Sequence, residues 1–143
     1  MASRKKGKTS ILKGIPEDLS SLALAYRLTQ KASRLGFDWP DLSGVLKKMD
    51  EEMEEFREAL SLENRRRIAE ELGDLLFVLV NVARYLRIDP EKALKGTVDK
   101  FSSRFQFIET SLCQAGKSVH QSNLVEMDRL WEEAKKRKKT GFR

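Results

Sequence analysis

Two pairs of carboxylates stand at helical spacing in the middle of the chain. Glu52 and Glu55 lie three residues apart, and Glu71 and Asp74 repeat that spacing nineteen residues further on. Residues i and i+3 share one side of a helix, so each pair would project from one face. Crowded carboxylates repel one another unless a cation lies between them, and oxygen-only ligands suit Mg²⁺ or Mn²⁺ rather than zinc or copper. The spacing therefore favours a metal site. Pairing of each acid with a nearby Arg or Lys is the alternative.

Helical geometry separates these acids from their acidic neighbours. An apolar stripe runs through Met49, and at about 100° per residue Glu52 and Glu55 fall on its shoulder, with Lys48 between them. The other acids of this region are expected to face solvent; they are Glu51, Glu54, Glu58 and Glu70. A second seam, mostly polar, contains both Glu71 and Asp74. Its members step by three or four and are Arg67, Glu71, Asp74, Val78, Asn81 and Tyr85.

Five helices would carry these residues. They are expected over 16–35, 44–61, 65–87, 90–112 and 123–138. Pro16 suits a first helical turn and Gly36 a helix end, Asp89 would cap the helix that starts at Pro90, and Asn123 would begin the last helix as part of a capping box.

The apolar pattern predicts how these helices pack. Apolar residues recur every three or four positions along the second and fourth helices, as in helical bundles. The third is apolar on nearly every side from Leu72 to Leu86, which is typical of a helix covered by neighbours or by a second subunit. We therefore expect an all-α bundle of about five helices that forms a dimer with an intersubunit four-helix core.

Composition narrows the function class. The chain has 143 residues, of which 40% are apolar and 35% charged, and a net charge of +6. Basic tails at 1–13 and 136–143 are expected to flank a mildly acidic domain at 14–135. No apolar run approaches the ~20 residues of a membrane span, and no secretory signal pattern is present, so a cytoplasmic protein is predicted. Basic tails can contact nucleic acid, so a non-enzymatic helical adaptor that binds nucleic acid is a second hypothesis, although nucleic acid is not the expected main partner.

The single histidine and the single cysteine argue against other chemistries. A di-iron carboxylate bundle needs Glu-x-x-His pairs, and His120 lies in a linker far from both acid pairs. Cys113 has no supported base for nucleophilic catalysis and no second cysteine for a disulfide.

The acidic motifs match a known pattern. Glu51-Glu52-x-x-Glu55, followed by Glu71-Leu72-Gly73-Asp74, resembles the EExxE…ExxD signature of MazG nucleoside triphosphate pyrophosphohydrolases, which belong to the all-α NTP pyrophosphatase superfamily. The resemblance covers residues 14–135. Within the family, the chain is similar to the second, C-terminal MazG domain of two-domain bacterial members. Its further segments are Asn81-Val82-Ala83-Arg84, Asp89-Pro90-Glu91, Lys100-Phe101, Arg104-Phe105 and Leu130-Trp131-Glu132-Glu133.

The resemblance implies a role for each matching residue. The Mg²⁺ ligands, with Mn²⁺ as a substitute, would be Glu52, Glu55, Glu71 and Asp74. Three basic residues would contact the triphosphate and stabilise the charge on the leaving pyrophosphate; they are Lys48, Lys100 and Arg104. Asn81 would hold the sugar or a ligand carboxylate, and Trp131 would stack on the base unless it is an ordinary packing residue. MazG proteins usually carry Asn at the position of Val98, which here suits a core stripe.

The implied reaction is Mg²⁺-dependent hydrolysis of a nucleoside triphosphate to the monophosphate and pyrophosphate, by a homodimer or larger oligomer. The attacking water would be activated either by the metal or by a glutamate of the cluster. Another enzyme of the superfamily, acting on phosphoribosyl-ATP or on pyrimidine nucleotides, is the alternative.

Overall fold

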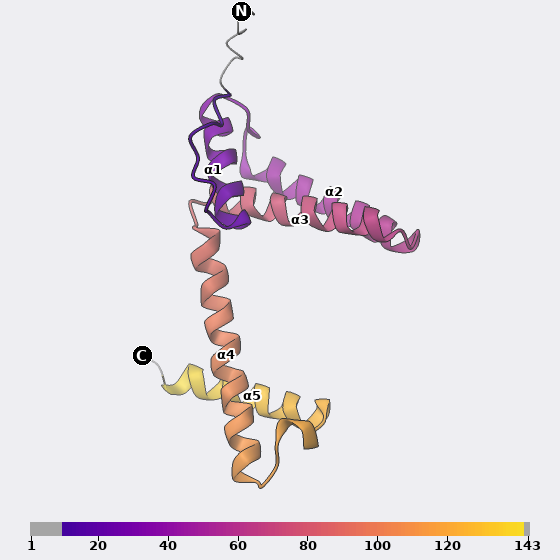
Figure 1. The fold of residues 1–143 in the computed structure, drawn as a ribbon, viewed down its shortest axis with the longest axis vertical. Coiled ribbons are helices and arrows are strands. Elements are labelled where there is room, and N and C mark those ends of the chain that lie inside the picture. Colours follow the sequence, from indigo (N-terminus) through magenta and orange to yellow (C-terminus); the bar gives the residue numbers. More distant parts are fainter. Residues whose placement is uncertain (1–9, 142–143) are drawn as a thin grey trace, which may run out of the picture. The chain divides into compact units, whose positions relative to one another are not determined.

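The described chain is all-α, as predicted. The computed structural model describes the backbone of residues 10–141 and the side chains of residues 10–137. Its helices are α1 (Ser21–Arg34), α2 (Leu42–Ser61), α3 (Arg65–Tyr85), α4 (Pro90–Gln114) and α5 (Leu124–Gly141), with a short 3₁₀ helix η1 (Val119–Gln121) (Figure 1). Residues 10–141 contain no strand. None of their helices has the length and apolar character needed to cross a bilayer.

Polar side chains set where the helices begin. The prediction that the first helix starts at Pro16 is wrong, because Ser20 caps it by accepting the Ala23 N–H at 3.1 Å. Asp41 starts α2 two residues earlier than expected, since its carboxylate accepts the Gly44 N–H at 2.9 Å. Asn123 caps α5 as predicted, by accepting the Glu126 N–H at 2.9 Å.

Residues with positive φ follow the ends of four helices, α1 to α4; they are Gly36, Glu63, Arg87 and Gly116. Gly36, at φ 93°, ends α1 as predicted, and its N–H donates to the Ser33 carbonyl. The third helix ends at Tyr85, two residues before the predicted limit, because Arg87 takes φ 57° and its N–H donates to the Arg84 carbonyl. This closing turn leads into the Asp89–Pro90 start of α4.

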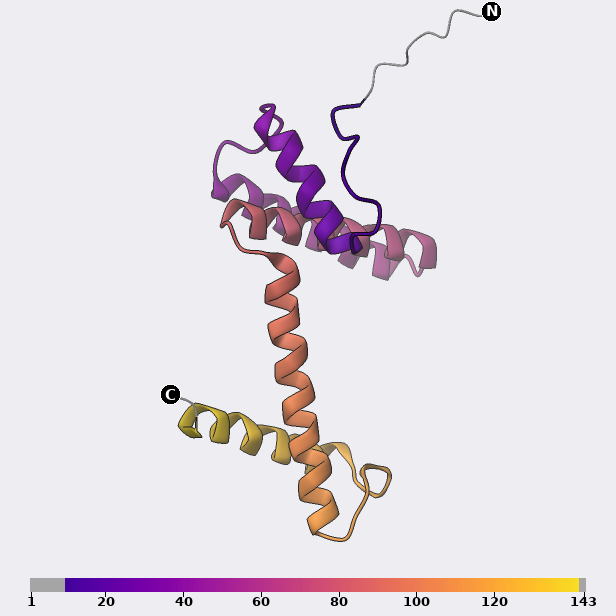
Figure 2. The same ribbon diagram turned by 60° about the vertical axis from the view of Figure 1, so that its left-hand side comes forward.

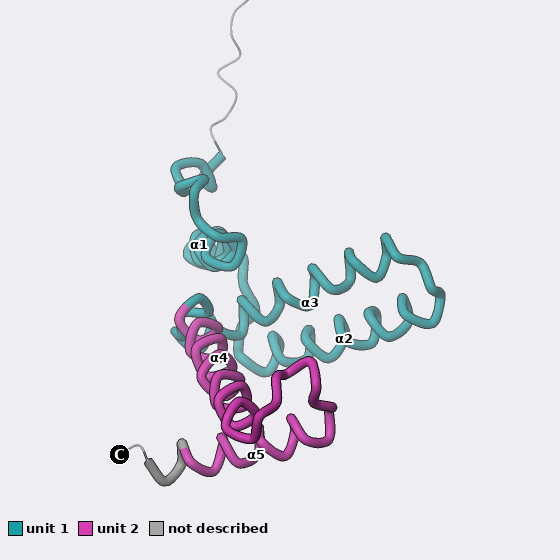
Figure 3. The backbone as a smooth tube through the Cα atoms, turned by 60° about the horizontal axis from the view of Figure 1, so that its bottom comes forward, with its two compact units in different colours: residues 1–91 teal, residues 92–143 magenta. Residues whose placement is uncertain are grey.

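The chain divides into two compact units, residues 1–91 and 92–143 (Figure 3). The sequence pattern does not mark this division. Helix α5 continues to Gly141, so the backbone of 136–141 extends the last helix where a basic tail was expected. Most of the predicted N-terminal tail, residues 1–9, and the side chains after residue 137 lie outside the described residues.

In unit 1, the antiparallel helices α2 and α3 pack side by side, and α1 lies against α3 (Figures 1 and 2). The most buried positions of α2 are Val45, Glu52 and Ala59, which follow one another at seven-residue intervals. Glu52 therefore lies at the centre of the packed face, and its predicted place on the shoulder is wrong. The predicted apolar stripe is wider than one neighbouring helix can cover, which leaves Met53 37% exposed.

In unit 2, α5 crosses the C-terminal half of α4 (Figures 1 and 2). Ile108, Leu112 and Leu130 form its buried core. The N-terminal half of the α4 stripe is uncovered in the described chain, and Val98, expected in a core, is 50% exposed. Only part of the predicted stripe is therefore buried within one chain.

Candidate active site

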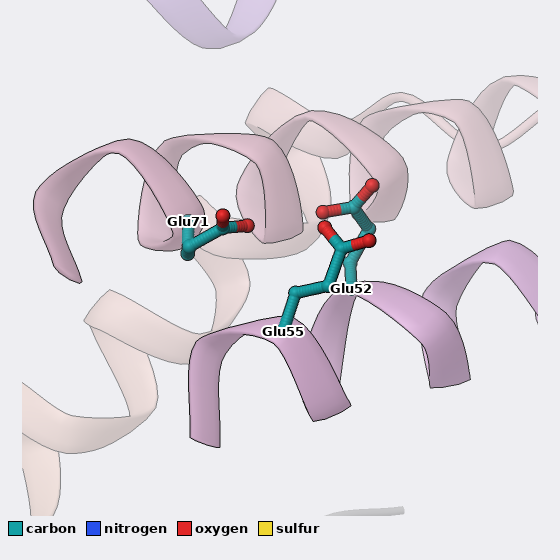
Figure 4. Close-up of side chains that lie close together, drawn as sticks. All are labelled: Glu52, Glu55 and Glu71. Carbon is teal, nitrogen blue, oxygen red and sulfur yellow. The ribbon is translucent and has the colours of Figure 1, made fainter. Parts of the chain in front are cut away.

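Three of the four predicted acids come together in unit 1. Glu52, Glu55 and Glu71 each place a carboxylate oxygen within 4.8 Å of the other two (Figure 4). Glu52 and Glu55 extend from neighbouring turns of α2 toward α3, which contributes Glu71 (Figure 4). The antiparallel packing of α2 on α3 thus produces the carboxylate group, by which we mean these three side chains.

Asp74 does not join the carboxylate group in the described structure. It follows Glu71 by one turn on α3 and is exposed. At about 100° per residue, Leu75 and Asp74 fall on opposite sides of Glu71, and Leu75 is the one buried in the packed face. Asp74 is also one methylene shorter than glutamate, so its carboxylate stays further from the α2 side chains.

The carboxylate group is crowded with negative charge. The pKa of Glu55 is raised, first by the charge of Glu52, then by burial and by the charge of Glu71. Lys48 Nζ lies 3.1 Å from Glu52 Oε1, and this contact raises the pKa of Lys48. Arg67 Nε lies 4.0 Å from Glu71 Oε1. One oxygen each of Glu52 and Glu71 therefore faces a cation.

The second oxygens of the same two residues are left without a partner. Glu52 Oε2 and Glu71 Oε2 are both buried, and neither accepts a hydrogen bond from any described residue. Burying a carboxylate oxygen without a partner is costly. Pairing with Lys48 and Arg67 satisfies only one of the two oxygens of each of these carboxylates. A hard divalent cation takes such oxygen donors, so the residues present fit Mg²⁺ or Mn²⁺.

The acids predicted to face solvent do so. Glu51, Glu54, Glu58 and Glu70 are all exposed. Glu54 accepts a hydrogen bond from Arg57 at 2.9 Å, and Glu70 lies 3.3 Å from Arg66 Nε. Such exposed pairs contribute little to stability, which marks these acids as surface residues.

Asn81 belongs to a buried polar network that sequence reasoning missed. Its Nδ2 donates to the Phe77 carbonyl at 3.3 Å, and its Oδ1 accepts from Arg84 at 3.1 Å. Arg84 also donates two hydrogen bonds to Asp38, at 2.8 and 2.7 Å. The Arg84 hydrogen bond lowers the pKa of Asp38 from 3.8 to about 2. The nearest signal in the sequence is the Arg84 that ends the Asn81-Val82-Ala83-Arg84 segment, but nothing local links it to Asp38.

The remaining predicted residues lie in unit 2. Lys100 is exposed on α4, and Arg104, one turn later, stacks its guanidinium 5.3 Å from the centre of the Trp131 ring. Arg104 Nε is buried without a hydrogen bond partner among the described residues. Trp131 also packs against the Ile108–Leu112–Leu130 core, which fits the packing alternative. Base stacking by Trp131 stays a prediction.

Similarity to known proteins identifies the family. Residues 42–106 match the MazG nucleotide pyrophosphohydrolase domain, a range that includes the four acids, Asn81, Lys48, Lys100 and Arg104 but not Trp131. The Thermotoga maritima nucleoside triphosphate pyrophosphohydrolase/pyrophosphatase MazG is 38% identical over 130 residues, which are 91% of this chain and 50% of that protein. The nucleoside triphosphate pyrophosphohydrolase of Escherichia coli K12 is 32% identical over 133 residues, which are 92% of this chain and 51% of that protein.

A further relative matches over a shorter length. The Bacillus subtilis protein YabN is 51% identical over 65 residues, which are 46% of this chain and 13% of that protein. The chain spans about half the length of the Thermotoga and Escherichia relatives. The match to the domain and the identity over most of the chain lead to one assignment: this chain belongs to the MazG nucleotide pyrophosphohydrolase family.

Proposed function

We propose that the protein hydrolyses nucleoside triphosphates to the monophosphate and pyrophosphate, with Mg²⁺ as the metal. The observation that carries this proposal is the pair of buried, unpartnered oxygens, Glu52 Oε2 and Glu71 Oε2, inside a group of three carboxylates. The Thermotoga and Escherichia relatives, both nucleoside triphosphate pyrophosphohydrolases, support the reaction class.

The ligands of the metal would be Glu52, Glu55 and Glu71, with Asp74 as a fourth. When bound, the ion neutralises phosphate charge and polarises the bond to be cleaved. Lys48 holds Glu52 in place and lies close enough to the group to contact a phosphate. Lys100 and Arg104, one turn apart on α4, would stabilise the charge of the leaving pyrophosphate.

Glu55 is our candidate for the base that takes a proton from the attacking water. Glu55 is the exposed member of the group, where water can reach it.

Pyrophosphate release should depend on a divalent cation. We expect the full chain to release pyrophosphate from standard NTPs and dNTPs in Mg²⁺. This release should stop in excess chelator and should recover when Mg²⁺ or Mn²⁺ is restored. Release followed by a coupled pyrophosphate assay, with a separate assay for orthophosphate, tests both points. Activity that persists in chelator would contradict the metal proposal, and orthophosphate as the product would contradict the reaction. Phosphoribosyl-ATP in the same panel tests the superfamily alternative.

We also propose that the protein is a homodimer and, as the sequence predicts, cytoplasmic. Large apolar side chains on α3 are 44–52% exposed and recur at helical spacing: they are Leu72, Leu76 and Leu79. On α2, Leu46 and Leu60 are exposed by 39% and 47%. Apolar surface of this kind on neighbouring helices is typical of a protein interface, and a second copy offers a matching face.

Replacing Leu76 with glutamate should separate the subunits. The side chain is 52% exposed in one chain, so the change costs the isolated fold little but would bury a charge in the proposed interface. Light scattering coupled to size-exclusion chromatography should give a dimer for the wild type and a monomer for L76E. The control is Leu124→Glu, at a residue 78% exposed on α5. A monomeric wild type, or an L76E dimer, would contradict the proposal.

A further inference from the structure

Unit 1 contains a cavity of about 270 Å³ that the carboxylate group does not account for. It lies between α1, the loop that follows α1, and α3. The residues that matter for its chemistry are Ala32 of α1, Phe37 and Trp39 of the loop, and Phe77, Asn81 and Arg84 of α3. Three of these six side chains are aromatic, so the walls suit a flat, unsaturated ring.

The aromatic side chains of the loop are placed in a way that core packing does not explain. Phe37 is 84% exposed, although it lines the cavity. Trp39 is held in place because its carbonyl accepts the Tyr85 hydroxyl at 2.7 Å. Its ring also lies so close to the start of α2 that a Cβ added at Gly44 would come within 3.2 Å of it. The cavity thus combines one fixed ring with one that is open to solvent.

A buried donor at the same cavity lacks an acceptor. Arg84 is 8% exposed at its side chain, and its terminal nitrogens bond Asp38 and Asn81. Its Nε is buried and donates to no described residue. Asn81 adds a carboxamide, which can both donate and accept. These polar groups lie behind a mainly apolar wall, so the surface of the cavity itself suits the flat face of a ring.

The distance to the carboxylate group suits a substrate that reaches both. Helix α3 carries Glu71 and then Phe77 and Asn81, which at 1.5 Å per residue lie about 9 and 15 Å further along the axis. That separation is comparable to the length from the base to the phosphates of a nucleoside triphosphate. We propose that this cavity holds the base of the nucleoside triphosphate whose phosphates bind at the carboxylate group, an inference that rests on the proposed function.

Two variants test this without threatening the fold. Phe37→Ala removes an exposed ring, and Ala32→Leu fills the cavity with apolar atoms. Each should raise the KM for a nucleoside triphosphate by about tenfold, as expected for the loss of one base–aromatic contact. Neither should change inhibition by inorganic triphosphate, which has no base. Leu35→Ala is the matched control, because Leu35 is 62% exposed beside the cavity and does not line it.

A binding measurement makes the test independent of catalysis. The chain has two tryptophans, so Trp131→Phe leaves Trp39 as the only one. We expect at least one nucleoside, added without metal, to quench Trp39 fluorescence in a saturable way. The nucleosides to test are adenosine, guanosine, cytidine and uridine. Adding Ala32→Leu to this background should weaken that binding by about tenfold.

The outcomes separate the cavity from the reaction. The cavity proposal would be overturned if both cavity variants kept the wild-type KM and Ala32→Leu did not weaken any quenching by nucleosides. The pyrophosphohydrolase proposal would then still stand. If Trp131→Phe instead raises the KM while both cavity variants keep it, the base binds at Trp131 and the cavity proposal is overturned. Nucleoside quenching that Ala32→Leu weakens, in a chain that releases no pyrophosphate, would support the base site and overturn the reaction.

Discussion

Replacing Glu52 with glutamine is expected to lower kcat/KM for pyrophosphate release by about a hundred- to a thousandfold, the range found when one preorganised charge-stabilising group is removed. Glutamine keeps the shape of the side chain but removes the charge that faces the metal site. Glu52 is the buried member of the carboxylate group and has one oxygen without a partner, so no other described carboxylate occupies its place.

Metal binding gives a second readout for the same variant. A ligand that binds only the folded protein raises the Tm, so Mg²⁺ should raise the wild-type Tm and have little effect on that of Glu52→Gln. The same measurement on Asp74→Asn tests whether Asp74 is the fourth ligand.

The matched control lies on the same helix. Glu54 is exposed and pairs with Arg57 on the surface, so Glu54→Gln should keep both the activity and the Mg²⁺-dependent rise in Tm. A Glu52→Gln enzyme that behaves like this control would show that the carboxylate group is not the metal site.

The helices could be predicted from sequence because their signals are local. Apolar spacing and the caps at Asp89 and Asn123 lie within a few residues of the structure they determine, and both caps are present. The start of α1 could not be predicted, because Pro16 and Ser20 both suit a helix start. The choice between them depends on how the residues before Ser20 fold. Local signals therefore gave the helices more reliably than their ends.

The packing of α2 was mispredicted for a reason that concerns function. A helical wheel assumes that charged residues face water, so it placed the centre of the buried stripe at Met49 and Phe56. In the structure the centre is Glu52, because a carboxylate is held inside the α2–α3 contact. Hydrophobic patterning fails where a protein places a charge in its interior, and such places are often functional sites.

Asp38 and Arg84 could not be paired from sequence. They are separated by 46 residues, and their contact depends on how α1 and its loop pack against α3. The prediction for Asn81 met the same limit. Its polar seam on α3 was recognised, but the side chains that it bonds were not.

Replacing Arg84 with methionine should destabilise the fold by about 3 to 5 kcal/mol, the cost of breaking a buried ion pair by removing one partner. Asp38 would keep only its bonds from the Ser33 hydroxyl and the Trp39 N–H, at 2.7 and 2.9 Å. Urea unfolding followed by circular dichroism measures the loss. Arg57→Met, which removes an exposed arginine, is the control and should change stability by less than about 1 kcal/mol. Equal losses in the two variants would show that the Asp38–Arg84 pair has no special role.

The Asp38–Arg84 pair should also make stability depend on pH in a defined window. The pKa of Asp38 is about 2 in the folded chain, against 3.8 for the model carboxyl, chiefly because of the Arg84 hydrogen bond. The folded state therefore favours the ionised form of Asp38, which adds about 2 kcal/mol to the free energy of unfolding above pH 4. As the pH falls from 4 toward 2, the unfolded chain takes up the proton first and this contribution disappears. Because other carboxylates titrate in the same range, the measurement is the difference in unfolding free energy between the wild type and Asp38→Asn. That difference should be constant between pH 7 and 5 and should shrink by about 2 kcal/mol by pH 2, whereas a difference that does not change with pH would contradict the lowered pKa.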